Sequence, residues 1–217
     1  MTESEWLACR DPGAMLEFVR GKASDRKLRL FACACASRVL KPGGSHRKWN
    51  ILTAVERYAD GATEHGEVQS ILAEELRLIE PDHEHVLDGL DFSRYLGTTF
   101  LLRGLASQDA RSAVAAVMPN AWELAADGRG EVSTQCGLLR DIVNPFRPVT
   151  LDPAWLTPNV ALLAGDIYQG HAFDQLPTLA NALVDAGCTN EPILDHLRSP
   201  GLHVHGCWAL DLVLGKE

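Results

Sequence analysis

Apolar residues recur along much of the chain at intervals of three and four positions. The clearest stripe is formed by Leu28, Phe31, Cys35 and Val39, a spacing that places side chains on one face of an α-helix. Similar spacing or strong helix propensity extends to residues 49–61, 63–79 and 107–122. No segment alternates apolar and polar residues for long enough to predict a sheet. The pattern therefore predicts an all-α fold of short capped helices.

Residues that commonly begin or end helices lie between these amphipathic segments. Thr2 and Glu5 form a capping box, and Asp11 followed by Pro12 predicts a helix that runs to Val19. The other predicted starts are Ser24, Thr157 with Pro158, and Thr189, and the predicted stops are Pro42-Gly43-Gly44, Gly61, Pro81, Gly187 and Ser199-Pro200-Gly201. These starts and stops favour many short helices over a few long ones.

Two stretches interrupt the helical pattern. Asp127-Gly128-Arg129-Gly130 is the best candidate for a loop or an internal boundary, and a short helix is predicted after it over residues 136–142. Residues 144–158 are rich in proline and predict an extended strap, which Trp155 would pin to the core. We expect residues 1–217 to form a single helical domain despite the candidate boundary.

The last predicted helix, residues 203–214, is apolar almost all round. Val204, Trp208 and Leu212 lie on one side, and Leu210 and Leu214 on another. A helix without a polar face belongs in the interior of a protein. We therefore expect it to be buried.

Composition narrows the classes of function. The chain has 217 residues, 46% of them apolar, and 29 acidic against 20 basic residues give a formal net charge of −9. The densest basic stretch, residues 20–29, is a short run beside a helix, so we expect no binding of nucleic acid. No segment approaches the run of about twenty apolar residues that a membrane span requires, and the acidic N-terminus does not resemble a signal peptide. These features predict a cytoplasmic protein without membrane association, whose six cysteines stay reduced.

Potential metal ligands gather near the C-terminus: Cys188, His196, His203, His205 and Cys207. On a helix, His203 and Cys207 would lie one turn apart on the same face, a spacing that can chelate a metal ion. Cys188 and His196 could complete a tetrahedral site, and four protein ligands would make it a structural zinc site. The set lacks the paired spacing of zinc motifs, so the alternative is that the cysteines pack as small apolar residues while the histidines cap helices or face water. We expect this metal-free arrangement and no cofactor, with zinc as the alternative.

A thiol enzyme is a further alternative for the same residues. His203, Cys207 and Asp211 would form a column on one helix face, but a Cys-His-Asp triad needs the histidine between the other two. Asp211 is therefore expected to form a salt bridge or a cap within the core. The two histidines of His83-Glu84-His85 are two residues apart, whereas the zinc-binding motif HExxH needs them four apart so that both face one side. We therefore expect this segment to be an exposed loop. The sequence contains no Walker loop, GxGxxG turn, GxSxG elbow or zinc-deaminase signature, so catalysis is left without a recognisable site.

Three segments carry a family resemblance: the opening MTESEWLACRDP, the strap NPFRPVTLDPAWLT and the ending GLHVHGCWALDLVLGK. The chain resembles a large paralogous family of planctomycete proteins in these segments, near both ends. The resemblance implies a middle of variable length, here residues 63–130, and no activity, substrate or cofactor. Ala36, Leu197 and His205 stand where the family more often has Cys, Cys and Arg.

Two classes of function remain after these exclusions. The first is a non-catalytic helical module that engages an unidentified protein partner. The second is a metal-binding or thiol-dependent protein that uses Cys188, His196, His203 and Cys207. We expect the first.

Overall fold

A computed structural model of the chain describes residues 1–40, 47–79, 89–146 and 149–216, excepting the side chains of 47–49 and 89–91. Every regular element within these ranges is helical, which confirms the predicted all-α fold. The α-helices are α1 (Glu3–Ala8), α2 (Pro12–Phe18), α3 (Asp25–Val39), α4 (Arg47–Ala59), α5 (His65–Ile79), α6 (Gly89–Leu105), α7 (Ala110–Leu124), α8 (Gly128–Ile142), α9 (Pro158–Gly170), α10 (Leu176–Asp185), α11 (Glu191–Arg198) and α12 (Trp208–Leu214). Two 3-10 helices, η1 (Pro153–Trp155) and η2 (Phe173–Gln175), flank α9.

The first three helices begin at the side chains that the sequence predicts. The Thr2 hydroxyl accepts a hydrogen bond from the Glu5 amide at 3.2 Å, and the Glu5 carboxylate accepts one from the Thr2 amide at 2.7 Å. Asp11 accepts bonds from two backbone amides at the start of α2, and Ser24 accepts one at the start of α3. Because these side chains satisfy amides that have no partner inside the helix, they fix where each helix starts.

Two predicted boundaries are wrong. Asn190, not Thr189, caps α11, because its side-chain oxygen accepts the amide of Ile193 at 3.3 Å. Residues 127–130 are not a loop: Asp127 caps α8 and the helix already begins at Gly128. A good N-cap thus outweighs the low helix propensity of two glycines in the first turn.

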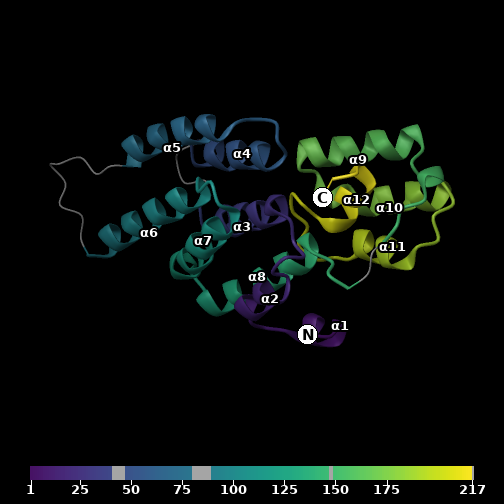
Figure 1. Cartoon of the computed structure of the whole chain (residues 1–217), viewed down its shortest axis with the longest axis horizontal. Helices are drawn as coiled ribbons and strands as arrows, with labels where there is room; N and C mark the ends of the chain where they lie inside the picture. The colour runs from purple at the N-terminus through teal and green to yellow at the C-terminus, as the bar shows by residue number, and fades with distance from the viewer. Residues whose placement is uncertain (41–46, 80–88, 147–148, 217) are drawn as a thin grey trace.

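The first hydrophobic core gathers buried side chains from Trp6 to Val143. Helix α3 packs against α4, α7 and α8 in this core (Figure 1). Its predicted stripe is confirmed at Leu28, Phe31 and Cys35, which are buried. Cys33 is buried as well, because α3 has neighbours on more than one side.

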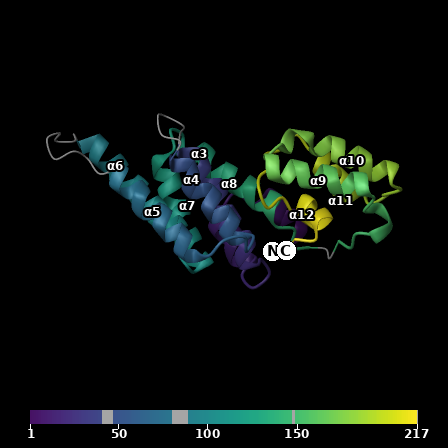
Figure 2. The same ribbon diagram turned by 90° about the horizontal axis from the view of Figure 1, so that it is seen from above.

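The second hydrophobic core gathers buried side chains from Val160 to Val213. Helices α9 to α12 form it, and both Figure 1 and Figure 2 show them grouped beside the larger helical cluster. Helix α12 packs on α9 and α11. The prediction of a buried final helix is confirmed for Ala209, Leu210, Asp211 and Val213, while Trp208 is only half-buried.

The predicted strap connects the two cores. At its beginning Phe146 stacks on Phe18, with ring centroids 5.4 Å apart, and lies against the edge of Trp6. Further along, Trp155 packs against the second core, as the sequence predicts. The strap therefore leaves one core and joins the other, with η1 as its one helical turn among the described residues.

The last helix is shorter than predicted. It begins at Trp208, so His203 lies in the preceding loop and Cys207 is the N-cap residue. Gly206 has φ +94°, a left-handed conformation that an α-helix cannot contain. A Cβ at this position would lie 2.9 Å from Cδ1 of Leu30. The close approach of α3 and the left-handed turn therefore both require glycine at position 206.

Some predicted features lie outside the described residues: the stops Pro42-Gly43-Gly44 and Pro81, and the His83-Glu84-His85 segment. Within the described residues, no helix has both the length and the apolar character needed to cross a membrane.

Candidate metal centre

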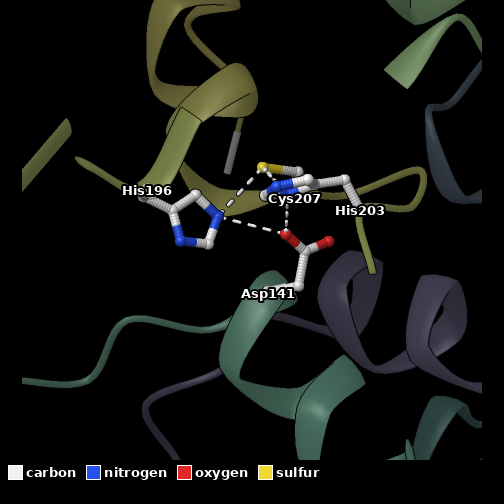
Figure 3. Close-up of side chains that lie close together, drawn as sticks. All are labelled: Asp141, His196, His203 and Cys207. Atoms are coloured by element: carbon white, nitrogen blue, oxygen red, sulfur yellow. Dashed lines mark hydrogen bonds and ion pairs between the residues drawn. The ribbon is translucent and has the colours of Figure 1, made fainter. Parts of the chain in front are cut away.

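Four side chains converge where the two cores meet: Asp141, His196, His203 and Cys207 (Figure 3). Asp141 stands in the last turn of α8, on the side of the first core, and His196 stands in the last turn of α11. His203 and Cys207 belong to the loop that leads into α12. The cluster thus joins segments that are more than fifty residues apart in sequence: the Asp141 and His196 positions differ by 55.

The ligand atoms lie close enough together to surround one ion. Oδ1 of Asp141 is 2.7 Å from Nδ1 of His203 and 3.1 Å from Nε2 of His196. Sγ of Cys207 is 3.3 Å from Nε2 of His196 and 3.9 Å from Nδ1 of His203. Zinc bond lengths of about 2.0 to 2.3 Å in a tetrahedron imply ligand separations of about 3.3 to 3.6 Å. The observed separations bracket that range.

A proton or a metal ion is needed between Asp141 and His203. Nε2 of His203 lies 3.2 Å from the carbonyl oxygen of Ser199 and 3.3 Å from the Ser199 hydroxyl, which can donate a hydrogen bond to it. In the neutral ring with its proton on Nδ1, this nitrogen donates to the carboxylate oxygen 2.7 Å away. A metal ion bound between Asp141 and His203 would replace this proton. The bond to Ser199 also orients the ring, as outer partners of metal-binding histidines commonly do.

The carboxylate is held by further contacts. Its second oxygen, Oδ2, accepts the backbone amide of Val204 at 2.9 Å. Asp141 is 3% exposed. Burial opposes its ionisation, but the bonds from His196 and His203 outweigh burial and keep the pKa of the carboxyl below its ordinary value. Asp141 is therefore a fixed negative charge at neutral pH.

The protonation of His203 and of Cys207 depends on whether a metal ion is bound between the four side chains. Burial lowers the pKa of His203, but the bond from Asp141 outweighs it and the net effect is a raised pKa. Burial raises the pKa of the Cys207 thiol well above its ordinary value, and the charge of Asp141 adds to this effect. Without a metal the cluster is thus a hydrogen-bonded carboxylate and imidazole beside an inert thiol, and a metal ion would displace protons from His203 and Cys207.

The cluster borders a cavity of about 610 Å³, whose lining includes Asp141, His196, His203 and Trp208. The Trp208 ring lies beside that of His196, tilted by 46°, with ring centroids 4.8 Å apart. The His196 side chain is 17% exposed, against 3% for that of Asp141. An ion can therefore enter from the His196 side.

The same geometry argues against a catalytic triad. In a triad one histidine nitrogen faces the nucleophile and the other faces the acid. Here Nε2 of His196 faces both Cys207 and Asp141, and Nδ1 of His203 does the same. Each ring directs one nitrogen at a shared centre, which is the arrangement of ligands and not of a proton relay.

The predicted column of His203, Cys207 and Asp211 does not form, because His203 is not on the helix. Asp211 instead accepts hydrogen bonds from Arg26 at 2.6 Å and Lys27 at 2.5 Å. This confirms that Asp211 forms a salt bridge within the core.

Of the ligands predicted from the sequence, His196, His203 and Cys207 come together and Cys188 does not belong to the group. Cys188 is buried in the second core. Asp141 takes the fourth place, which sequence spacing could not suggest. One signal was present: Asp141 interrupts the apolar run of Leu138, Leu139 and Ile142 on α8, where a carboxylate is costly unless it has partners.

No family model matches the chain, and neither a curated protein nor a solved structure is significantly similar to it.

Proposed function

We propose that the protein is a non-catalytic helical module stabilised by one zinc-type divalent ion bound to Asp141, His196, His203 and Cys207. The observation that supports it is that both histidines direct a single nitrogen at the point shared by the carboxylate and the thiol. A carboxylate, a thiolate and two imidazoles are a donor set that suits zinc. The sequence left a zinc site as the alternative to a metal-free arrangement, and the position of Asp141 favours the zinc site.

The number of ligands supports a structural role. Four protein ligands fill a tetrahedral coordination sphere and leave no position for a reacting water. Burial of the Cys207 thiol, 0% exposed, also disfavours its use as a nucleophile. A closed site agrees with a protein that acts by presenting a surface to a partner.

Such an ion would connect the two hydrophobic cores. Asp141 belongs to the helix that closes the first core, while Cys207 and the segment of His196 belong to the second. Binding that occurs only in the folded chain adds to folding stability, by about 4 kcal/mol when the free ion is at a thousand times its dissociation constant. The module would therefore depend on metal for the relative placement of its two parts.

Cobalt binding tests the proposal, because a cysteine thiolate bound to Co²⁺ gives a near-ultraviolet charge-transfer band. Metal-free protein titrated with Co²⁺ should develop this band with a one-to-one endpoint, and Zn²⁺ should abolish it. The melting temperature should rise on metal binding and fall on chelation.

Cys188→Ala is the matched control for Cys207→Ala, because both thiols are buried in the second core. Each substitution should cost about 1 to 2 kcal/mol in the metal-free protein through lost packing. Only Cys207→Ala should remove the charge-transfer band. The absence of a band in the unmodified protein at saturating Co²⁺, or its persistence in Cys207→Ala, would show that these residues form a hydrogen-bonded carboxylate and imidazole beside a packed thiol.

A further inference from the structure

A second group of ligand-type side chains lies on the other side of the same loop: Glu56, His171 and His205. Glu56 comes from α4, His171 is the C-cap of α9, and His205 lies between the two predicted ligands of the first site. One potential ligand atom from each lies within 4.8 Å of the others. Nε2 of His171 is 3.6 Å from Oε2 of Glu56, and the rings of His171 and His205 have centroids 4.9 Å apart.

His205 lies beside the carboxylate of Asp60. Nε2 of His205 is 3.7 Å from Oδ2 of Asp60, within ion-pair distance. Asp60 is itself held by Arg26 at 2.8 Å, by the Tyr168 hydroxyl at 2.6 Å and by Lys216 at 2.9 Å. Burial opposes the ionisation of Asp60, but the bonds from His205 and its other partners hold the pKa of this carboxyl far below its ordinary value.

Nδ1 of His205 is buried and has no hydrogen-bond partner among the residues that the structure describes. A buried polar nitrogen without a partner is costly in a protein interior. In the neutral ring with its proton on Nε2, this nitrogen offers a lone pair to a cation.

A carboxylate beside one histidine nitrogen, with the other nitrogen unpaired, resembles the environment of metal-binding histidines. Burial lowers the pKa of the neighbouring His171, which favours the neutral ring that metals bind. His171 is the C-cap of α9 and has φ +52°, so the left-handed turn that ends the helix sets the position of this ring.

We propose that Glu56, His171 and His205 form a second divalent-cation site, with three protein ligands and open coordination positions. A cavity of about 180 Å³ borders all three residues and is also lined by Ser37, Thr53 and Phe173. Water or a small anionic ligand can complete the coordination sphere there. The donor set of two imidazoles and one carboxylate suits divalent ions such as Zn²⁺, Co²⁺ and Fe²⁺.

This site is more accessible than the first. The His171 side chain is 49% exposed and that of Glu56 17%. With three ligands and an exposed edge, the second site should bind more weakly and exchange faster than the first. The two sites share no ligand, so substitutions can remove the ligands of each site separately.

Co²⁺ binding distinguishes the two sites, because the second site contains no thiolate and therefore gives no thiolate-to-cobalt charge-transfer band. We expect the unmodified protein to bind two equivalents of Co²⁺, of which only one contributes the charge-transfer band. Cys207→Ala combined with His196→Ala removes the thiolate and one imidazole of the first site. This double variant should lose the band and still bind one equivalent, measured by calorimetric titration with Co²⁺ alone. Adding His171→Asn or Glu56→Gln to the double variant should weaken that binding at least about tenfold.

The substitutions are chosen to preserve the fold. Asn tolerates the left-handed conformation of residue 171, and Gln keeps the shape of Glu56. Glu67→Gln, on the exposed face of α5, is the control and should leave binding unchanged. Circular dichroism should report the same helix content for all variants.

Retention of the second equivalent in both His171→Asn and Glu56→Gln would overturn the proposal, as would the absence of any Co²⁺ binding in the double variant of Cys207→Ala and His196→Ala. The latter result would mean that the His205 ring is only stacked between Tyr168 and His171. Failure of the first site is recognised separately, by a missing charge-transfer band in the unmodified protein.

Discussion

Replacement of Asp211 by Asn should destabilise the protein strongly. Asp211 is 1% exposed and stands on α12, in the second core. Its carboxylate accepts hydrogen bonds from Arg26 at 2.6 and 3.1 Å and from Lys27 at 2.5 Å, and both donors stand in the first turn of α3. The substitution keeps the shape of the side chain and removes the charge that neutralises two cations.

The two cations are affected unequally. Arg26 keeps its bonds to Asp60 at 2.8 Å and to the Tyr168 hydroxyl at 2.7 Å. Lys27 keeps only an uncharged partner among its described contacts, the carbonyl oxygen of Gly206 at 2.8 Å. Burial already lowers the pKa of Lys27, against the attraction of Asp211. Removing one partner of a buried ion pair costs about 3 to 5 kcal/mol, because the remaining charge is left uncompensated.

Differential scanning calorimetry and urea unfolding at neutral pH measure the effect. For a chain of this size, about 3 to 5 kcal/mol corresponds to a fall in melting temperature of about 6 to 20 °C. The exposed Asp185→Asn, which also removes one negative charge, should change stability by no more than about 0.5 kcal/mol. Lys27→Met combined with Asp211→Asn should recover part of the loss, because no uncompensated lysine remains.

A loss below about 1 kcal/mol for Asp211→Asn would refute this reasoning. It would mean that water reaches the cations as soon as the carboxylate is neutralised. Equal losses for Asp211→Asn and the double variant would refute the argument from the uncompensated charge of Lys27.

Three further substitutions test other parts of the structure. Gly206→Ala should cost about 1 to 3 kcal/mol and weaken Co²⁺ binding, because residue 206 has φ +94° and its Cβ would meet Leu30 at 2.9 Å; wild-type melting and binding would contradict this. Asp60→Asn should cost about 2 to 4 kcal/mol at pH 7. Because the folded-state pKa of Asp60 lies far below its ordinary value of about 3.9, its contribution is fully present above that value and is lost only gradually as pH falls below it. Urea unfolding should therefore show a constant difference between the two proteins from pH 7 to about 5 and a smaller difference at pH 3. Phe31→Ala should cost about 3 to 5 kcal/mol in urea unfolding, since this side chain is 1% exposed in the first core, and a near-neutral result would place α3 at the surface.

Local signals in the sequence predicted the helices well. The stripe of Leu28, Phe31 and Cys35 and the cap at Ser24 are confirmed, because an amphipathic spacing and a capping side chain act within a few residues of one another. The predicted loop at 127–130 is wrong because Asp127 provides a cap that overrides two glycines. Where two local signals compete, the sequence alone does not rank them.

The extent of the last helix was decided by tertiary packing. The apolar character of residues 203–214 predicted a single helix, which would have aligned His203 with Cys207. Gly206 instead adopts a left-handed turn where Leu30 approaches closely, the helix begins only at Trp208, and His203 lies in the loop before it. His203 and Cys207 still meet at the first site, but through the path of the loop and not through helical spacing.

The sequence by itself determined the helical class and the starts of α1, α2, α3 and α9, and it indicated three members of the candidate metal centre: His196, His203 and Cys207. Only the tertiary structure could replace Cys188 by Asp141, and only it could bring His205 to Glu56 and His171. The physical reason is distance along the chain. Spacing rules relate residues within a few turns of one helix, whereas both candidate sites form where helices of the first core meet the segment between α11 and α12.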